Sequence, residues 1–155
     1  MSEGNIILTH KSLCYYEGCL SHFHIYIFVV AVTVCGNSGW TSHDDYNLMK
    51  FPYIKTNIGI NNVTSTGIFT CNSAGLYQIT AVIFSRSSGG TMGIFENDVI
   101  MISSLYTAEN SNYEQHTTTD VVMTELRVGD SIHMRRRSPI DIFARDSCLT
   151  IVKIK

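Results

Sequence analysis

Three consecutive arginines, Arg135–Arg137, form the strongest local concentration of charge in the sequence. A guanidinium group is planar and presents forked donors that suit phosphate, sulfate and carboxylate groups. If this segment is an extended strand, alternate side chains face opposite ways, so at most two of Arg135, Arg136 and Arg137 share a face. The arginines are therefore either a solvated strand end or a binding patch for anionic groups on a microbial glycan or lipid head group.

Metal ligation has weaker candidates. His43, Asp44 and Asp45 form a polar cluster, and acidic oxygens on a loop can hold calcium, which takes six to eight oxygen ligands. The spacing is not that of an EF-hand loop, and His22 and His24 are only two positions apart. We therefore expect no metal and no cofactor, with calcium as the alternative.

The five cysteines are Cys14, Cys19, Cys35, Cys71 and Cys148, with no C-x-x-C pair among them. An odd count leaves at least one thiol unpaired, or paired between chains. Cys71 is expected to be a small buried apolar residue on a strand. Whether Cys14 and Cys19 form a local disulfide stays open.

Catalysis has no sequence support. The segment Gly36–Gly39 lacks the G-x-S-x-G spacing that places a nucleophilic serine at a strand-to-helix turn. No spacing brings a nucleophile, a base and an orienting group together. The sequence therefore predicts a binding protein, not an enzyme.

Bulk composition narrows the class of protein further. The 155 residues suit a single domain, and 45% hydrophobic residues exclude a disordered chain. Only 15% of the residues are charged, which fits a protein that buries area against copies of itself. The net charge of −2 gives no reason to expect nucleic acid or an anionic membrane as the main partner.

The elements that must position these residues are short strands. Between Asn57 and Tyr77, two turns bracket the strand-like run Ile68–Cys71, and Leu76–Ser85 follows with apolar residues at period two. We expect eight to ten strands and no helix, with loops over Gly36–Asn47 and Arg136–Asp146. This pattern predicts an all-β fold, an antiparallel jelly-roll β-sandwich with two sheets of short strands.

The N-terminal region is the least interpretable part. Residues 1–24 are an extension of uncertain structure. The apolar run Ile25–Cys35 is either the hydrophobic part of a secretory signal or the first strand of the domain, and the strand is favoured. It is too short to span a membrane, which takes about 20 apolar residues. The domain is thus expected over residues 25–155.

The stretch Asn57–Tyr77 resembles the globular-head domain of the C1q family, in the C1q/tumour necrosis factor superfamily. Asn62 stands where that family usually has Tyr, and Asn72 where it has Pro. The segment Cys148–Ile151 replaces its Phe-Ser-Gly-Phe pattern. The positions that match the family pattern, including its later leucine-x-x-glycine-aspartate turn, are Asn57, Gly59, Thr66, Gly67, Phe69, Cys71, Gly75, Tyr77, Gly129 and Asp130.

The resemblance implies a secreted, extracellular homotrimer without a collagen stalk, since no Gly-X-Y repeat is present. It implies a pattern-recognition, lectin-like protein of innate immunity that binds microbial carbohydrate multivalently through loops. The loops are Ser85–Thr91, Glu109–His116 and Arg135–Asp146. The alternative is a trimeric signalling ligand of the tumour necrosis factor or cerebellin kind, which binds a protein receptor.

Two further expectations depend on the resemblance. The strand face around Tyr77, Ile79 and Ala81 is expected to form the trimer interface. Asn62-Val63-Thr64 is an N-glycosylation sequon that matters if the chain is secreted, and the family match places Asn62 in a turn.

Overall fold

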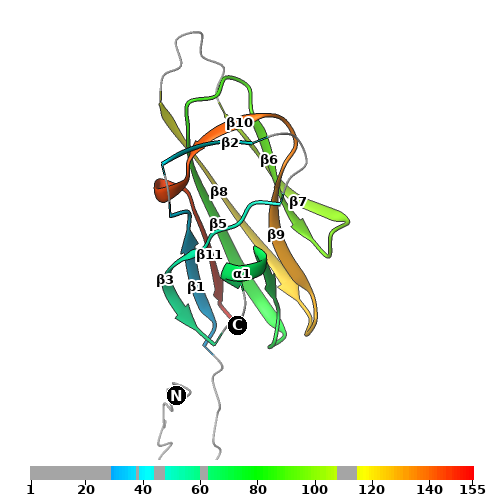
Figure 1. The fold of residues 1–155 in the computed structure, drawn as a ribbon. Helices are drawn as coiled ribbons and strands as arrows, with labels where there is room; N and C mark the ends of the chain where they lie inside the picture. Colours follow the sequence, from blue (N-terminus) through cyan, green and yellow to red (C-terminus); the bar gives the residue numbers. More distant parts are fainter. Residues whose placement is uncertain (1–28, 38, 44–47, 60–62, 108–114) are drawn as a thin grey trace, which may run out of the picture.

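The computed structural model describes residues 29–155, apart from residues 38, 44–47, 60–62 and 108–114. The described residues form a sandwich of two antiparallel β-sheets with one short helix, α1 (Val63–Thr66), packed at its side (Figure 1). The expected jelly-roll β-sandwich is confirmed. Among these residues, no helix is long and apolar enough to cross a membrane.

The larger sheet has seven strands in the order β2-β10-β5-β11-β1-β3, with β8 paired to β5. The smaller sheet has the order β4-β9-β6-β7. The strands of the larger sheet are β1 (Ala31–Cys35), β2 (Trp40–His43), β3 (Tyr53–Ile58), β5 (Gly75–Ser85), β8 (His116–Leu126), β10 (Ile140–Phe143) and β11 (Cys148–Lys153). Those of the smaller sheet are β4 (Ile68–Thr70), β6 (Thr91–Glu96), β7 (Ile100–Tyr106) and β9 (Ser131–Arg136).

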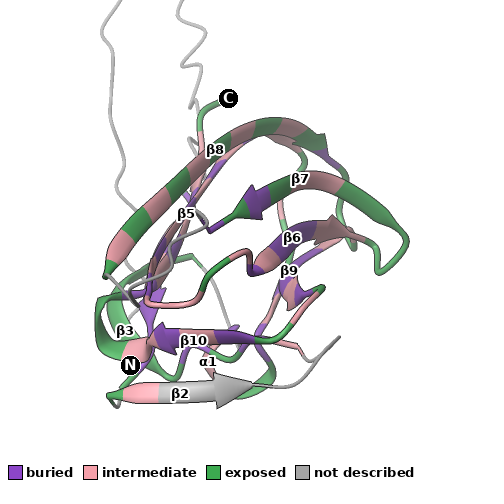
Figure 2. Ribbon diagram, turned by 90° about the horizontal axis from the view of Figure 1, so that it is seen from above, coloured by how far each residue is buried: buried purple, intermediate pink, exposed green. Residues whose placement is uncertain are grey.

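The core lies between the two sheets and is formed largely by alternate residues of strands such as β1, β5 and β11. Tyr77, Ile79 and Ala81 on β5 are 0% exposed in the single chain, and Figure 2 shows half-buried and exposed positions alternating along β8. Expecting these three side chains at a trimer interface was therefore wrong. A period-two pattern reveals an apolar face, but it does not say whether that face packs inside the chain or outside it.

Two predicted loops contain strands. β2 lies within Gly36–Asn47 and β10 lies within Arg136–Asp146, and the two pair antiparallel from Ile140 opposite His43 to Phe143 opposite Trp40. Each has only four residues, too few for a clear periodic signal. The expectation of no helix was also wrong, since α1 and a 3₁₀ turn (Ala144–Asp146) are present, but both are too short to leave a helical period.

The N-terminal expectation is confirmed in part. Residues 31–35 of the apolar run form β1, which pairs with β3 and with the last strand, β11. Residues 1–24 and 25–28 lie outside the described residues. β1 is thus an internal strand of the larger sheet.

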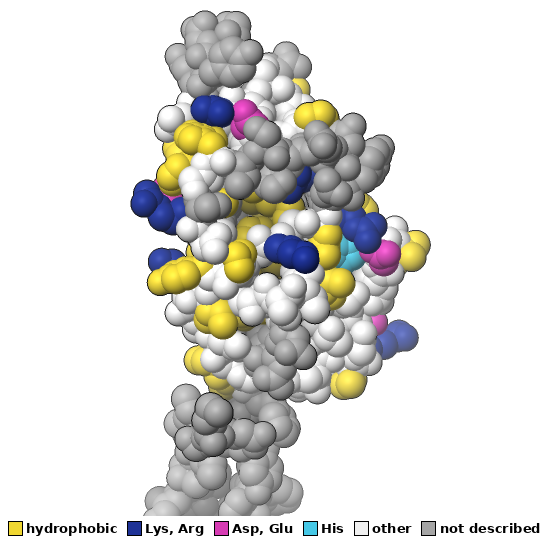
Figure 3. Space-filling view, viewed as in Figure 1, with side chains coloured by type: hydrophobic (Ala, Val, Ile, Leu, Met, Phe, Trp, Pro, Cys, Tyr) yellow, Lys and Arg dark blue, Asp and Glu magenta, His cyan; other side chains and the backbone are white. Residues whose placement is uncertain are grey.

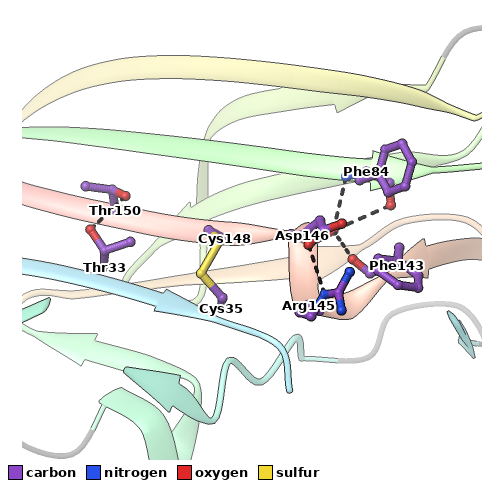
Figure 4. The surroundings of a disulfide bond; sticks show 9 residues. Thr33, Cys35, Phe84, Phe143, Arg145, Asp146, Cys148 and Thr150 are labelled. Atoms are coloured by element: carbon purple, nitrogen blue, oxygen red, sulfur yellow. Dashed lines mark hydrogen bonds and ion pairs between the residues drawn. A yellow bond between two sulfur atoms is a disulfide. The ribbon is translucent and has the colours of Figure 1, made fainter. Parts of the chain in front are cut away.

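One disulfide joins the first and last of these strands, Cys35 to Cys148, across 113 positions of sequence (Figure 4). Thr33 and Thr150 lie beside it, with their hydroxyl oxygens 3.1 Å apart. Cys71 is buried, as predicted, and it is unpaired, but it lies one residue beyond the end of β4 rather than on a strand. Cys14 and Cys19 lie outside the described residues.

Two of the family-pattern residues, Gly67 and Asp130, have structural roles that the fold explains. Gly67 has φ +76°, and a Cβ there would lie 2.7 Å from the Met49 carbonyl oxygen. Asp130 accepts hydrogen bonds from the Arg127 backbone N–H (2.7 Å) and the Asn97 side-chain amide (2.8 Å). The bond from Arg127, and after it the bond from Asn97, lowers the pKa of Asp130. Because Asn97 and Asp130 lie in different turns, their bond also connects the β6–β7 turn to the β8–β9 turn.

Candidate anion-binding site

The end of β9 separates the three arginines onto two faces of the smaller sheet. Ile132 and Met134 point into the core at 0% exposure, and Arg136, two positions further, is only 2% exposed. The side chain of Arg135 is 35% exposed, and Arg137 is exposed. The prediction that at most two of the arginines share a face is confirmed: Arg135 and Arg137 lie on the outer face, and Arg136 lies on the inner one.

His133 lies on the same outer face and is deeply buried there. Its ring stacks on Phe95, with centroids 5.7 Å apart and planes 8° apart, and its Nε2 lies 3.2 Å from the Asp98 carboxylate. Desolvation lowers the pKa of His133, the Arg135 charge lowers it further, and Asp98 opposes both. The imidazole is therefore neutral at pH 7.

Asp98 also forms an ion pair with Arg135, so one carboxylate contacts both basic side chains. It reaches them from the β6–β7 turn, where Asn97 and Asp98 both adopt positive φ, at 50° and 66°. Such values suit a two-residue hairpin turn. Arg135 lies 6.0 Å above the Phe95 ring. Dark blue, cyan and magenta side chains gather on this face in Figure 3.

Arg137 extends the patch and has no acidic partner among the described residues. Its Nη1 lies 3.6 Å from the sulfur of Met101 on β7, and its guanidinium is exposed. We call His133, Arg135, Arg137, Phe95 and Asp98 the outer-face cluster. Its donors suit an anion, whereas no group of three potential metal ligands occurs in the described part of the chain.

A second mixed cluster lies at the β2–β10 end of the larger sheet. Trp40, Phe84 and Phe143 form a triangle with ring centroids 5.3 to 6.0 Å apart. Arg86 lies 4.5 Å above the Trp40 ring and 3.3 Å from the Asp141 carboxylate. Sequence reasoning missed this cluster because its members are far apart in the chain and meet only through the β2–β10 and β10–β5 pairing.

Several predicted site residues cannot be placed. Asn62, Asp44 and Asp45 lie outside the described residues, as does most of the loop Glu109–His116. Glycosylation at Asn62 and calcium at Asp44 and Asp45 therefore remain expectations from the sequence.

The model of the C1q domain family matches residues 25–150. The chain belongs to the C1q domain family. Within this C1q domain, the matched region contains every residue of the outer-face cluster, the disulfide, and the eleven strands of the described residues except the end of β11.

Solved structures of several other proteins are similar to this C1q domain. The globular domain of zebrafish complement 1qA has a TM-score of 0.70 at 15% identity, covering 81% of this chain and 98% of that one. Eiger TNF from S. frugiperda has a TM-score of 0.70 at 14% identity, covering 82% and 93%. Murine APRIL has a TM-score of 0.63 at 12% identity, covering 81% and 99%. These likenesses establish the shared fold.

Proposed function

We propose that this chain is a secreted, homotrimeric C1q-domain protein that binds anionic groups of microbial glycans without catalysis. The observation that carries the proposal is the shared outer face of Arg135 and Arg137, where Arg137 has no acidic partner among the described residues. A guanidinium group with unused donors beside a second one is a recognition element for phosphate, sulfate or carboxylate. The disulfide supports secretion, because such bonds persist in oxidising compartments.

The trimer part of the proposal uses the outer face of the larger sheet. Two rows cross β1, β11, β5 and β8 there, and neither contains a charged residue. At the β8 end of the rows, Val121 and Met123 are 53% and 59% exposed. Two neutral rows edged by exposed apolar side chains suit burial against a second copy. The rows are Thr33, Thr150, Thr80 and Val121, and Ala31, Val152, Gln78 and Met123.

The test measures binding to immobilised lipopolysaccharide, whose phosphates are the probe, with neutral mannan as the comparison. The double variant R135Q/R137Q should bind at least about tenfold more weakly, since each charge-assisted hydrogen bond contributes about 1.5–3 kcal/mol. The control R127Q/R145Q removes the same charge from exposed arginines elsewhere. Equal losses in both doubles, or equal binding to mannan, would contradict recognition at this face.

Light scattering tests the assembly. We expect three times the chain mass for the wild type and the single-chain mass for T80R, which places a charge in the middle of the neutral rows. A wild-type monomer would contradict the trimer and with it the multivalency.

A signalling ligand remains the second candidate. Val99 and Ile100, at the end of the β6–β7 turn, are 83% and 56% exposed, and an exposed apolar tip suits a protein receptor. Lipopolysaccharide binding that is absent in the wild type, together with specific binding to a cell-surface protein that V99D abolishes, would favour this function.

A further inference from the structure

The side chain of Arg136 enters the core of the sandwich. On the inner face of the smaller sheet it occupies one row with Met92 of β6 and Leu105 of β7. The exposed fractions of the three residues are 2%, 0% and 2%. A guanidinium group thus lies in an otherwise apolar row.

Two of its nitrogens have no acceptor. Nε and Nη1 of Arg136 are both inaccessible to solvent, and no described residue accepts a hydrogen bond from either. Leaving buried donors unpaired is costly, and more so when they are charged.

The charge remains on Arg136 at physiological pH. Desolvation lowers the pKa of its guanidinium to about 10, which is still well above 7. A buried cation of this kind strongly destabilises a fold unless an opposite charge lies beside it. The described residues supply no carboxylate in contact with Arg136.

We propose that Arg136 binds a small monovalent anion, of the size and charge of chloride, inside the sandwich. A single cation is matched by a single negative charge. The apolar row offers no donors for the additional oxygens of phosphate or sulfate. This site lies on the opposite face of β9 from the outer-face cluster, so it goes beyond the proposed recognition function.

The experiment follows thermal unfolding of the full chain as sodium gluconate is replaced by sodium chloride at constant ionic strength. A ligand that binds only the folded state raises the melting temperature with its concentration. The wild type should show a rise that levels off as the site fills, and R136M should show none. R127M is the matched control and should behave as the wild type, because Arg127 is exposed and belongs neither to the interior site nor to the outer-face cluster.

A second measurement does not depend on the folding of R136M. Crystals of the wild type soaked in bromide should give an anomalous peak within hydrogen-bond distance of the Arg136 guanidinium. The proposal would be overturned by a wild-type melting temperature that does not change with chloride concentration, or by crystals without that peak. If, after such a result, D44N/D45N lowered the melting temperature as much as R136M did, a carboxylate of the chain itself would be the counter-charge.

The outcome is separable from that of the recognition test. R136M that folds should retain wild-type binding to lipopolysaccharide, whereas R135Q/R137Q should retain the chloride response. Loss of lipopolysaccharide binding in folded R136M would mean that the two faces act together, and would contradict a separate interior site.

Discussion

Arg135 and Arg136 are neighbours in the chain, yet their side chains lie on opposite faces of one sheet, 35% and 2% exposed. Their strand partners are Gly93 and Met92, so the same alternation holds on β6. This relationship gives two adjacent arginines different surroundings. The side chain of Arg135 contacts solvent and the Asp98 carboxylate, whereas the side chain of Arg136 lies in an apolar core.

Without an external anion, Asp98 forms an ion pair with Arg135, so its carboxylate should compete with a bound ligand for the guanidinium group. We expect D98N to strengthen binding to lipopolysaccharide by about two- to fivefold, because an exposed ion pair contributes about 0.2–1 kcal/mol. Biolayer interferometry at fixed salt measures the change. The control is D146N, which removes the same charge from an exposed pair with Arg145. Weaker binding of D98N would mean that Asp98 orients the arginine instead.

The disulfide closes a long loop, and its loss should be costly. Chain-entropy estimates for a loop of about 100 residues give about 4–5 kcal/mol. We expect the C35A/C148A variant to unfold at a markedly lower urea concentration than the oxidised wild type. Reductant should lower the midpoint of the wild type and leave that of the variant unchanged. An equal response of both proteins would contradict a stabilising role for this bond.

Acid should destabilise the fold through His133. Its folded-state pKa is lowered below the ordinary value of 6.5, chiefly by burial, so the unfolded chain takes up a proton before the folded one does. This contribution to stability is fully present above pH 6.5 and is lost as the pH falls from 6.5 through the folded-state pKa. Urea unfolding between pH 7.5 and 5 should show this loss, and H133Q should flatten it. H116N is the control. If the dependence of stability on pH is unchanged in H133Q, another group causes the effect.

Gly75 begins β5 with φ +154°, and a Cβ there would overlap the carbonyl oxygen of Lys155. We expect G75A to lower the free energy of unfolding by about 1–3 kcal/mol, the usual cost of a backbone conformation that L side chains avoid. The matched control is G39A, whose Cβ would meet the Phe143 ring at an ordinary 3.7 Å. Equal melting temperatures for the two variants would show that the C-terminal residues move aside freely.

Much of the fold was predictable because its signals are local. The turns around Gly67 and Gly75 and the period-two run of β5 each depend on a few adjacent residues. The split of Arg135–Arg137 across two faces follows from strand geometry in the same way. β2 and β10 were missed because each is short, and its stability comes from the other strand rather than from its own sequence.

The candidate site was predictable only in part. Arg135 and Arg137 could be singled out from their charge, but His133 and Asp98 could not. Asp98 and His133 lie 35 positions apart and meet because β6 pairs with β9. The spacing of residues in the sequence does not reveal which residues of β6 and β9 lie opposite each other.

The sequence by itself determined an all-β domain of the C1q kind, the alternation along β5 and β9, and a buried Cys71, because each depends on local backbone geometry and side-chain type. Tertiary structure decided which face of β5 is core, which cysteines pair, and which carboxylate meets Arg135. These outcomes depend on sheet register and on the packing of one sheet over the other. Both bring together residues far apart in the chain, through contacts that no local pattern encodes.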